Sequence, residues 1–147
     1  MKRIIGILAV LLMPLAADAQ LYIDTVKNVD AKVFIPKVRY KRAQQGMEIY
    51  KDLIFSIEDG GHVNVYDFKT ADPEPIAMFE LGSSHKDNHA NNASFGIETK
   101  KGASFPLMYI SVGKPGNEID LTCFVESITK KGKKFSSELV QKIILDI

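Results

Sequence analysis

Short apolar or alternating runs separated by turn residues fill the chain between residues 46 and 81. These runs lie at 46–50, 53–57, 62–68 and 76–81. Asp59-Gly60-Gly61 suits a tight hairpin turn, because glycine accepts the positive φ that such turns require. Pro73 and Pro75 cannot donate to a strand ladder, so they separate the last two runs. The pattern predicts four short antiparallel strands joined by turns.

The same pattern restarts after a polar loop at 82–92. Its apolar runs lie at 93–97, 106–112, 121–128 and 139–145. Lys100-Lys101-Gly102 and Lys131-Gly132-Lys133 are turn sequences. The chain therefore contains two units of about fifty residues with four strands each, a period that is typical of propeller blades.

The last apolar run also fits a helix. Leu139, Val140, Ile143, Ile144 and Ile147 follow helical spacing, and a serine just before them could cap such a helix. The run is rich in β-branched residues, follows a hairpin turn and occupies the fourth-strand position of the unit. We therefore expect a strand over 139–145.

Three segments carry a resemblance to a known family. They are residues 45–67, which include Asp59-Gly60-Gly61, residues 89–96 and residues 106–111. They resemble blades of secreted bacterial β-propeller proteins. The resemblance implies an all-β fold of antiparallel four-stranded blades in residues 44–147, with one blade at about 44–82 and another at about 89–147.

About two blades do not complete a ring, because propellers close with about four to eight. We therefore expect the N-terminal part of a longer propeller protein. Two alternatives stay open: several copies of the chain assemble a ring, or the fold is a different all-β one.

The first nineteen residues have the features of a signal peptide. Lys2 and Arg3 precede an uncharged, mostly apolar run over 4–16, and Ala17-Asp18-Ala19 fits a signal-peptidase site. The run is too short to cross a bilayer as a helix. We expect cleavage before Gln20, export to the periplasm or the outside of the cell, no membrane attachment afterwards, and a lead-in segment over 20–43.

Composition narrows the function classes. The chain has 147 residues, 46% apolar and 25% charged, which is ordinary for a globular protein. Removal of residues 1–19 leaves a formal net charge of zero, which argues against nucleic acid as a partner. Cys123 is the single cysteine, so the chain forms no internal disulfide. The basic alternating run over 37–42 is expected to be a solvated strand face.

The polar loop supplies the candidate ligand-binding residues: His89, Asn91 and Asn92. They precede the first strand of the second unit, and by the resemblance such a strand lines the central channel of a propeller. Imidazole and amide groups at a channel mouth could bind a sugar or a carboxylate. The alternative is that His89 and Asn91 hydrogen-bond to backbone in turns. His85 and His89 are four residues apart, but no third metal ligand accompanies them, so we expect neither a metal nor another cofactor.

The sequence thus predicts an exported binding or interaction module whose partner is a small molecule, a glycan, or the remaining blades of the same protein. Two other functions remain open: a fragment of a propeller hydrolase or lyase that acts on glycans, and a small all-β homo-oligomer. No nucleophile elbow, phosphate loop or dinucleotide fingerprint is present, so no catalytic residue can be named.

Overall fold

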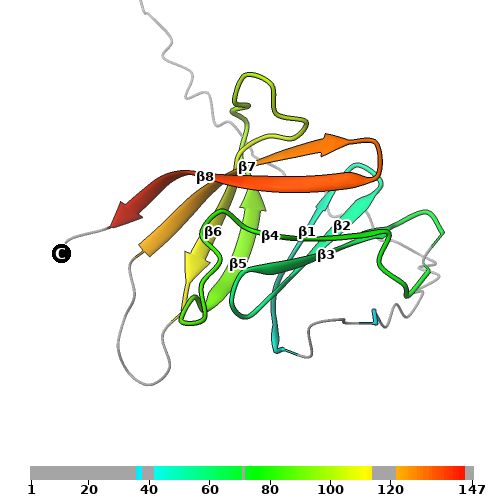
Figure 1. The fold of residues 1–147 in the computed structure, drawn as a ribbon, viewed down its shortest axis with the longest axis horizontal. Coiled ribbons are helices and arrows are strands. Elements are labelled where there is room, and N and C mark those ends of the chain that lie inside the picture. Colours follow the sequence, from blue (N-terminus) through cyan, green and yellow to red (C-terminus); the bar gives the residue numbers. More distant parts are fainter. Residues whose placement is uncertain (1–35, 38–41, 71, 114–121, 145–147) are drawn as a thin grey trace, which may run out of the picture. The chain divides into compact units, whose positions relative to one another are not determined.

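The computed structural model describes residues 36–37, 42–70, 72–113 and 122–144, so the expected signal peptide and most of the lead-in lie outside it. The described residues form two four-stranded antiparallel sheets, in each of which neighbouring strands follow chain order (Figure 1). The strands of the first sheet are β1 (Gln44–Tyr50), β2 (Leu53–Glu58), β3 (His62–Asp67) and β4 (Ala77–Glu80). Those of the second sheet are β5 (Ala90–Phe95), β6 (Met108–Val112), β7 (Thr122–Lys131) and β8 (Lys134–Ile144).

The all-β prediction is confirmed: the described residues contain no helix, and neither sheet closes into a barrel. The final apolar run is a strand, as expected, but its predicted limits were wrong. β7 continues to Lys131 and β8 already begins at Lys134, with Gly132 at a φ of 61° in the tight turn between them. The strand pattern was hard to see here because polar residues such as Lys130 and Ser136 occupy exposed positions of the ladder.

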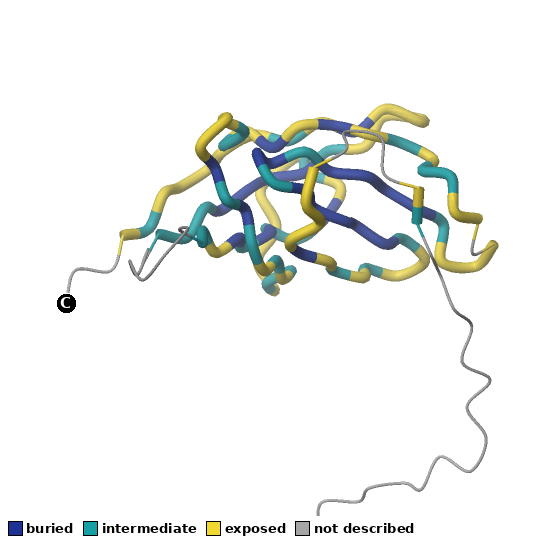
Figure 2. Tube along the Cα trace, turned by 90° about the horizontal axis from the view of Figure 1, so that it is seen from below, coloured by how far each residue is buried: buried dark blue, intermediate teal, exposed yellow. Residues whose placement is uncertain are grey.

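Aromatic side chains from both sheets fill the core. Phe55 of β2 is fully buried, and its ring centroid lies 5.3 Å from those of Phe95 and Phe105. Phe135 of β8 stacks on Phe79 of β4 at 6.0 Å. β2 and β3 are buried on both faces along most of their length, whereas β8 is mostly exposed. Figure 2 shows the buried segments in the interior and the exposed ones around them. Burial of these rings supplies the main hydrophobic stabilisation of the fold.

Two glycines permit close approach between the sheets, where β1 lies beside β5 and β4 lies near β8. A Cβ atom on Gly46 would lie 2.0 Å from the backbone oxygen of Asn91. A Cβ atom on Gly82 would lie 2.1 Å from the backbone nitrogen of Leu139. Backbone atoms cannot move aside as a flexible side chain can, so both positions require glycine.

A buried carboxylate fixes the second of these junctions. Glu126 of β7 is fully buried. Its Oε2 accepts hydrogen bonds from the Gly82 N–H at 2.9 Å and the Ser137 hydroxyl at 2.7 Å, and its Oε1 accepts one from the Ser83 N–H at 2.8 Å. One side chain of the second sheet thereby holds the chain directly after β4.

Replacement of Glu126 with glutamine should be strongly destabilising. The amide keeps the shape but presents NH₂ where a backbone N–H needs an acceptor, so we expect Glu126→Gln to lower the free energy of unfolding by about 2–4 kcal/mol. Urea unfolding measures this loss. The matched control is Glu138→Gln, because Glu138 is exposed and pairs with Lys100 at 2.7 Å; it should cost less than about 1 kcal/mol. Equal losses for the two variants would contradict the anchoring role of Glu126.

Candidate functional site

The structure pairs the predicted residue His89 with Asp59 of the β2–β3 turn. His89 directly precedes β5, and its Nδ1 lies 3.0 Å from Asp59 Oδ1. This oxygen is buried and accepts no aligned hydrogen bond from the described residues, so the contact is an ion pair only when the imidazole is protonated. The side chain of His89 is 37% exposed. One edge of the imidazole is therefore held by a carboxylate while part of the ring remains open to a ligand.

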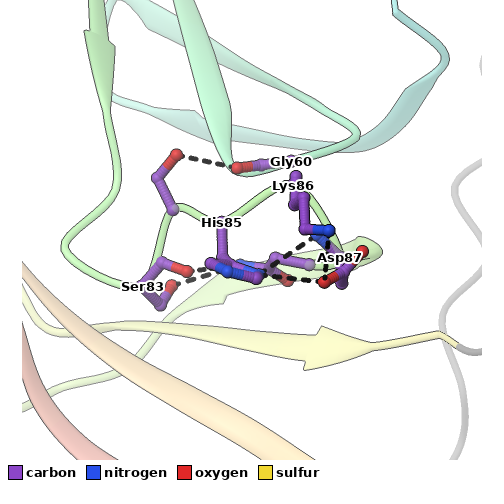
Figure 3. Close-up of polar contacts among 7 residues, drawn as sticks. Gly60, Ser83, His85, Lys86 and Asp87 are labelled. Carbon is purple, nitrogen blue, oxygen red and sulfur yellow. Dashed lines mark hydrogen bonds and ion pairs between the residues drawn. The ribbon is translucent and has the colours of Figure 1, made fainter.

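The loop before His89 is held around the glycine turn of the first sheet (Figure 3). The Gly60 carbonyl accepts hydrogen bonds from the Ser84 hydroxyl at 2.8 Å and the His85 N–H at 3.2 Å. The Gly60 N–H donates to the Asn88 carbonyl at 2.7 Å. Gly60 and Gly61 have φ values of 85° and 82°, which glycine adopts without strain. These bonds fix the course of the loop and deliver His89 to Asp59.

Asn91 and Asn92 lie in an irregularity of β5. The register with β6 shifts between Ala90 and Ala93, so both asparagines belong to this bulge. Asn91 is half-buried, its backbone oxygen facing Gly46 of β1, and Asn92 is exposed. A bulge re-aims the side chains it contains and is common beside functional sites. The structure thus places all three predicted residues at the beginning of β5, with Asn91 at the junction with β1.

Sequence analysis missed Asp59 as a candidate residue. It was interpreted only as part of a hairpin turn, the role that Asp-Gly-Gly sequences most often have. The pairing with His89 joins residues thirty positions apart, and the path of the intervening loop depends on hydrogen bonds that no local motif encodes. The local sequence offered no signal for this pair.

The Asp59–His89 pair can position an imidazole for ligand binding or proton transfer. A carboxylate near Nδ1 orients the ring and leaves Nε2 free to accept or donate a hydrogen bond. Within the described residues, no serine, threonine or cysteine side chain hydrogen-bonds to His89, so the pair lacks an adjacent nucleophile. His85 instead contacts Asp87, with Nδ1 and Oδ2 3.5 Å apart (Figure 3). Among all the residues that the structure describes, no group of three or more His, Cys, Asp or Glu side chains is placed to hold a metal ion.

The outer face of the first sheet points away from the second sheet. It contacts Lys37 and Arg42, the two described residues of the basic run over 37–42. The Tyr66 hydroxyl donates to the Lys37 carbonyl at 3.0 Å, and the Lys37 ammonium pairs with Glu74 at 2.6 Å. The Arg42 N–H donates to the buried Glu58 at 3.4 Å. Lys37 and Arg42 are exposed, as expected for a solvated face, but their backbones are anchored to the sheet. Residues 38–41 lie outside the described residues.

Comparisons of the chain with family models, with curated proteins and with solved structures find no match. The described residues include no helix long and apolar enough to span a membrane. Assignment of the site therefore depends on its geometry.

Tyr66 should make stability sensitive to alkaline pH. Its burial, with the nearby charges of Glu58 and Glu74, raises its pKa from 10.0 to about 12. A raised pKa in the folded state means that this contribution to stability is complete below pH 10 and is lost as the pH rises towards 12. The unfolding free energy should therefore fall more steeply in this range for the natural chain than for Tyr66→Phe. Urea unfolding across this range measures both slopes, and parallel slopes would contradict the assignment.

Proposed function

We propose that this chain is an exported, β-propeller-like binding module that binds a small polar ligand, such as a sugar of a glycan, at His89. The observation that carries the proposal is the contact between Asp59 Oδ1 and His89 Nδ1 at 3.0 Å, which presents a partly open imidazole at the beginning of β5. Two sheets of the same strand order, with β1 beside β5, support the comparison with propeller blades. In a propeller the first strands of the blades surround the channel, where ligands enter.

The groups around His89 define the ligand chemistry. Because Nδ1 faces Asp59, the other ring nitrogen is the one available to a hydroxyl or carboxylate group. The exposed amide of Asn92 adds a donor and an acceptor nearby in sequence. Imidazole and amide groups of this kind match the hydroxyl groups of carbohydrates, which both donate and accept hydrogen bonds.

Loss of the imidazole should abolish ligand binding with little loss of stability. We expect His89→Ala to remove the rise in melting temperature that a binding glycan or sugar acid from a ligand panel produces, while the melting temperature without ligand changes by only a few degrees. Asp59→Asn should weaken the same response, because it frees the ring to rotate.

The matched control is His85→Ala, in the same loop but 64% exposed and paired with Asp87; it should bind as the natural chain does. A panel without any shift, or a large stability loss in His89→Ala, would favour a purely structural histidine.

The outer face of the first sheet supports a second candidate function, association with further sheets. Met47 of β1 and Met78 of β4 lie in one cross-strand row with Ser56 and Asn64 between them. They are 62% and 45% exposed. Exposed apolar side chains on a sheet face mark an interaction surface. Additional blades of a longer protein or a second copy of the chain would cover this face.

The second-copy alternative predicts concentration-dependent assembly of the chain. Sedimentation velocity should show a dimer or larger ring at high protein concentration, and the double variant Met47→Gln, Met78→Gln should weaken association at least about tenfold, because it places polar amides at the interface. Phe68→Gln is the control, since Phe68 is 55% exposed on the turn after β3. A chain that stays monomeric at every concentration would contradict self-association.

A further inference from the structure

Three lysines gather where the β7–β8 turn meets the β1–β2 turn: Lys51, Lys130 and Lys133. Lys131 and Lys134 pair with each other in the next row of the ladder, so they lie on the other face of the hairpin. The segment 127–137 contains no acidic residue. In Figure 1 the two turns lie close to each other. Lys51 and Lys130 line the same hollow. The chain as a whole is nearly neutral, so this end is a local concentration of positive charge.

Two hollows on this end share Lys130. The first has a volume of about 360 Å³ and extends from the β1–β2 turn to Phe105. The second, of about 340 Å³, is lined by Ile76, Lys133 and Phe135. Each hollow thus combines lysines with apolar and aromatic walls. Each is large enough to contain part of a small organic ligand.

The ammonium groups at these hollows are free of acidic partners among the described ion pairs. Asp52, which lines the first hollow, is instead held by Lys69 at 2.8 Å. The Lys130 ammonium lies 5.3 Å from the centre of the Phe135 ring, and the Lys51 ammonium lies 5.2 Å from the Tyr50 ring. Cations over aromatic faces that form no ion pair with a carboxylate can receive an anionic group.

Lys51 also has a backbone that is unfavourable for lysine. Its φ is 55°, in the left-handed region that glycine adopts more readily, and no other described residue except glycine has a positive φ. A lysine at such a position is a reason to look for a role of its side chain. The ammonium at the hollow supplies one.

We propose that this surface, defined by Lys51, Lys130, Lys133 and the two hollows, binds an anionic polysaccharide with carboxylate or sulfate groups. A chain with an anionic group on successive sugars can place one ring in each hollow, with Lys130 between them. The apolar walls contact the faces of the sugar rings, and the lysines pair with the acidic groups. Recessed hollows with aromatic walls suit separate sugar rings better than the flat surface of a membrane.

The experiment measures binding of the full chain to heparin-derived oligosaccharides by calorimetry, with uncharged dextran oligosaccharides as the negative control. The double variant Lys130→Gln, Lys133→Gln should bind at least tenfold more weakly. The matched control, Lys37→Gln with Lys86→Gln, removes the same charge from exposed lysines that contact acidic residues elsewhere, and it should change affinity less than twofold. Binding should weaken as salt rises, because exposed charges are screened.

Lys51→Gly separates a binding role from a structural one. Glycine relieves the backbone at a φ of 55°, so the melting temperature should be unchanged or higher, while affinity for the oligosaccharide should fall about threefold or more.

Equal loss of affinity in the Lys130→Gln, Lys133→Gln variant and in its control would overturn the proposal, because it would show attraction to net charge alone. Absence of oligosaccharide binding at low salt would also overturn it. So would binding of vesicles with one third phosphatidylglycerol by a chain that does not bind the oligosaccharides, since the anion would then be a lipid.

Discussion

The hydrogen bonds to Glu126 are the constraint on which the arrangement of the sheets and the site depends. A buried carboxylate costs several kcal/mol unless its oxygens are fully hydrogen-bonded, so the chain after β4 must bring Gly82 and Ser83 to β7. Gly82 can come this near to β8 only because it has no side chain. From this point the loop turns back around Gly60 and ends at His89. The position of the imidazole beside Asp59 therefore depends on the hydrogen bonds that Glu126 of β7 makes with the chain after β4.

The two faces of the first sheet bury different kinds of side chain. The face towards the second sheet is closed by aromatic rings, whereas the outer face buries the polar side chains of Glu58 and Asn64. Glu58 accepts hydrogen bonds from the Asn64 amide and the Arg42 N–H, so its burial is partly compensated. Exposed methionines flank these polar groups. The outer face thus combines buried polar groups with exposed methionines, whereas the aromatic face is already covered, and this is why our proposal of association concerns the outer face.

The eight strands could be predicted because short apolar runs and turn residues are local signals. Gly132 indicated the β7–β8 turn. The ends of β7 and β8 could not be predicted, because exposed lysines and serines continue the ladder there. The partner of His89 could not be found in this way, since Asp59 is distant in sequence and its motif already had a local explanation. The lysine surface was missed for a related reason: the charges of Lys51 and of the β7–β8 turn combine only when the sheets pack.

The two proposed binding surfaces lie at opposite ends of β2, since Lys51 precedes this strand and Asp59 follows it. Six residues of extended chain separate them by about 20 Å. Sites this far apart without shared partners respond to substitution almost independently. The residues of β2 between them that face the core, Phe55 and Ile57, have no polar group to offer a ligand. The strand therefore acts as a rigid spacer, and the chemistry is confined to the turns, where lysine, aspartate and histidine can be exposed without weakening the core.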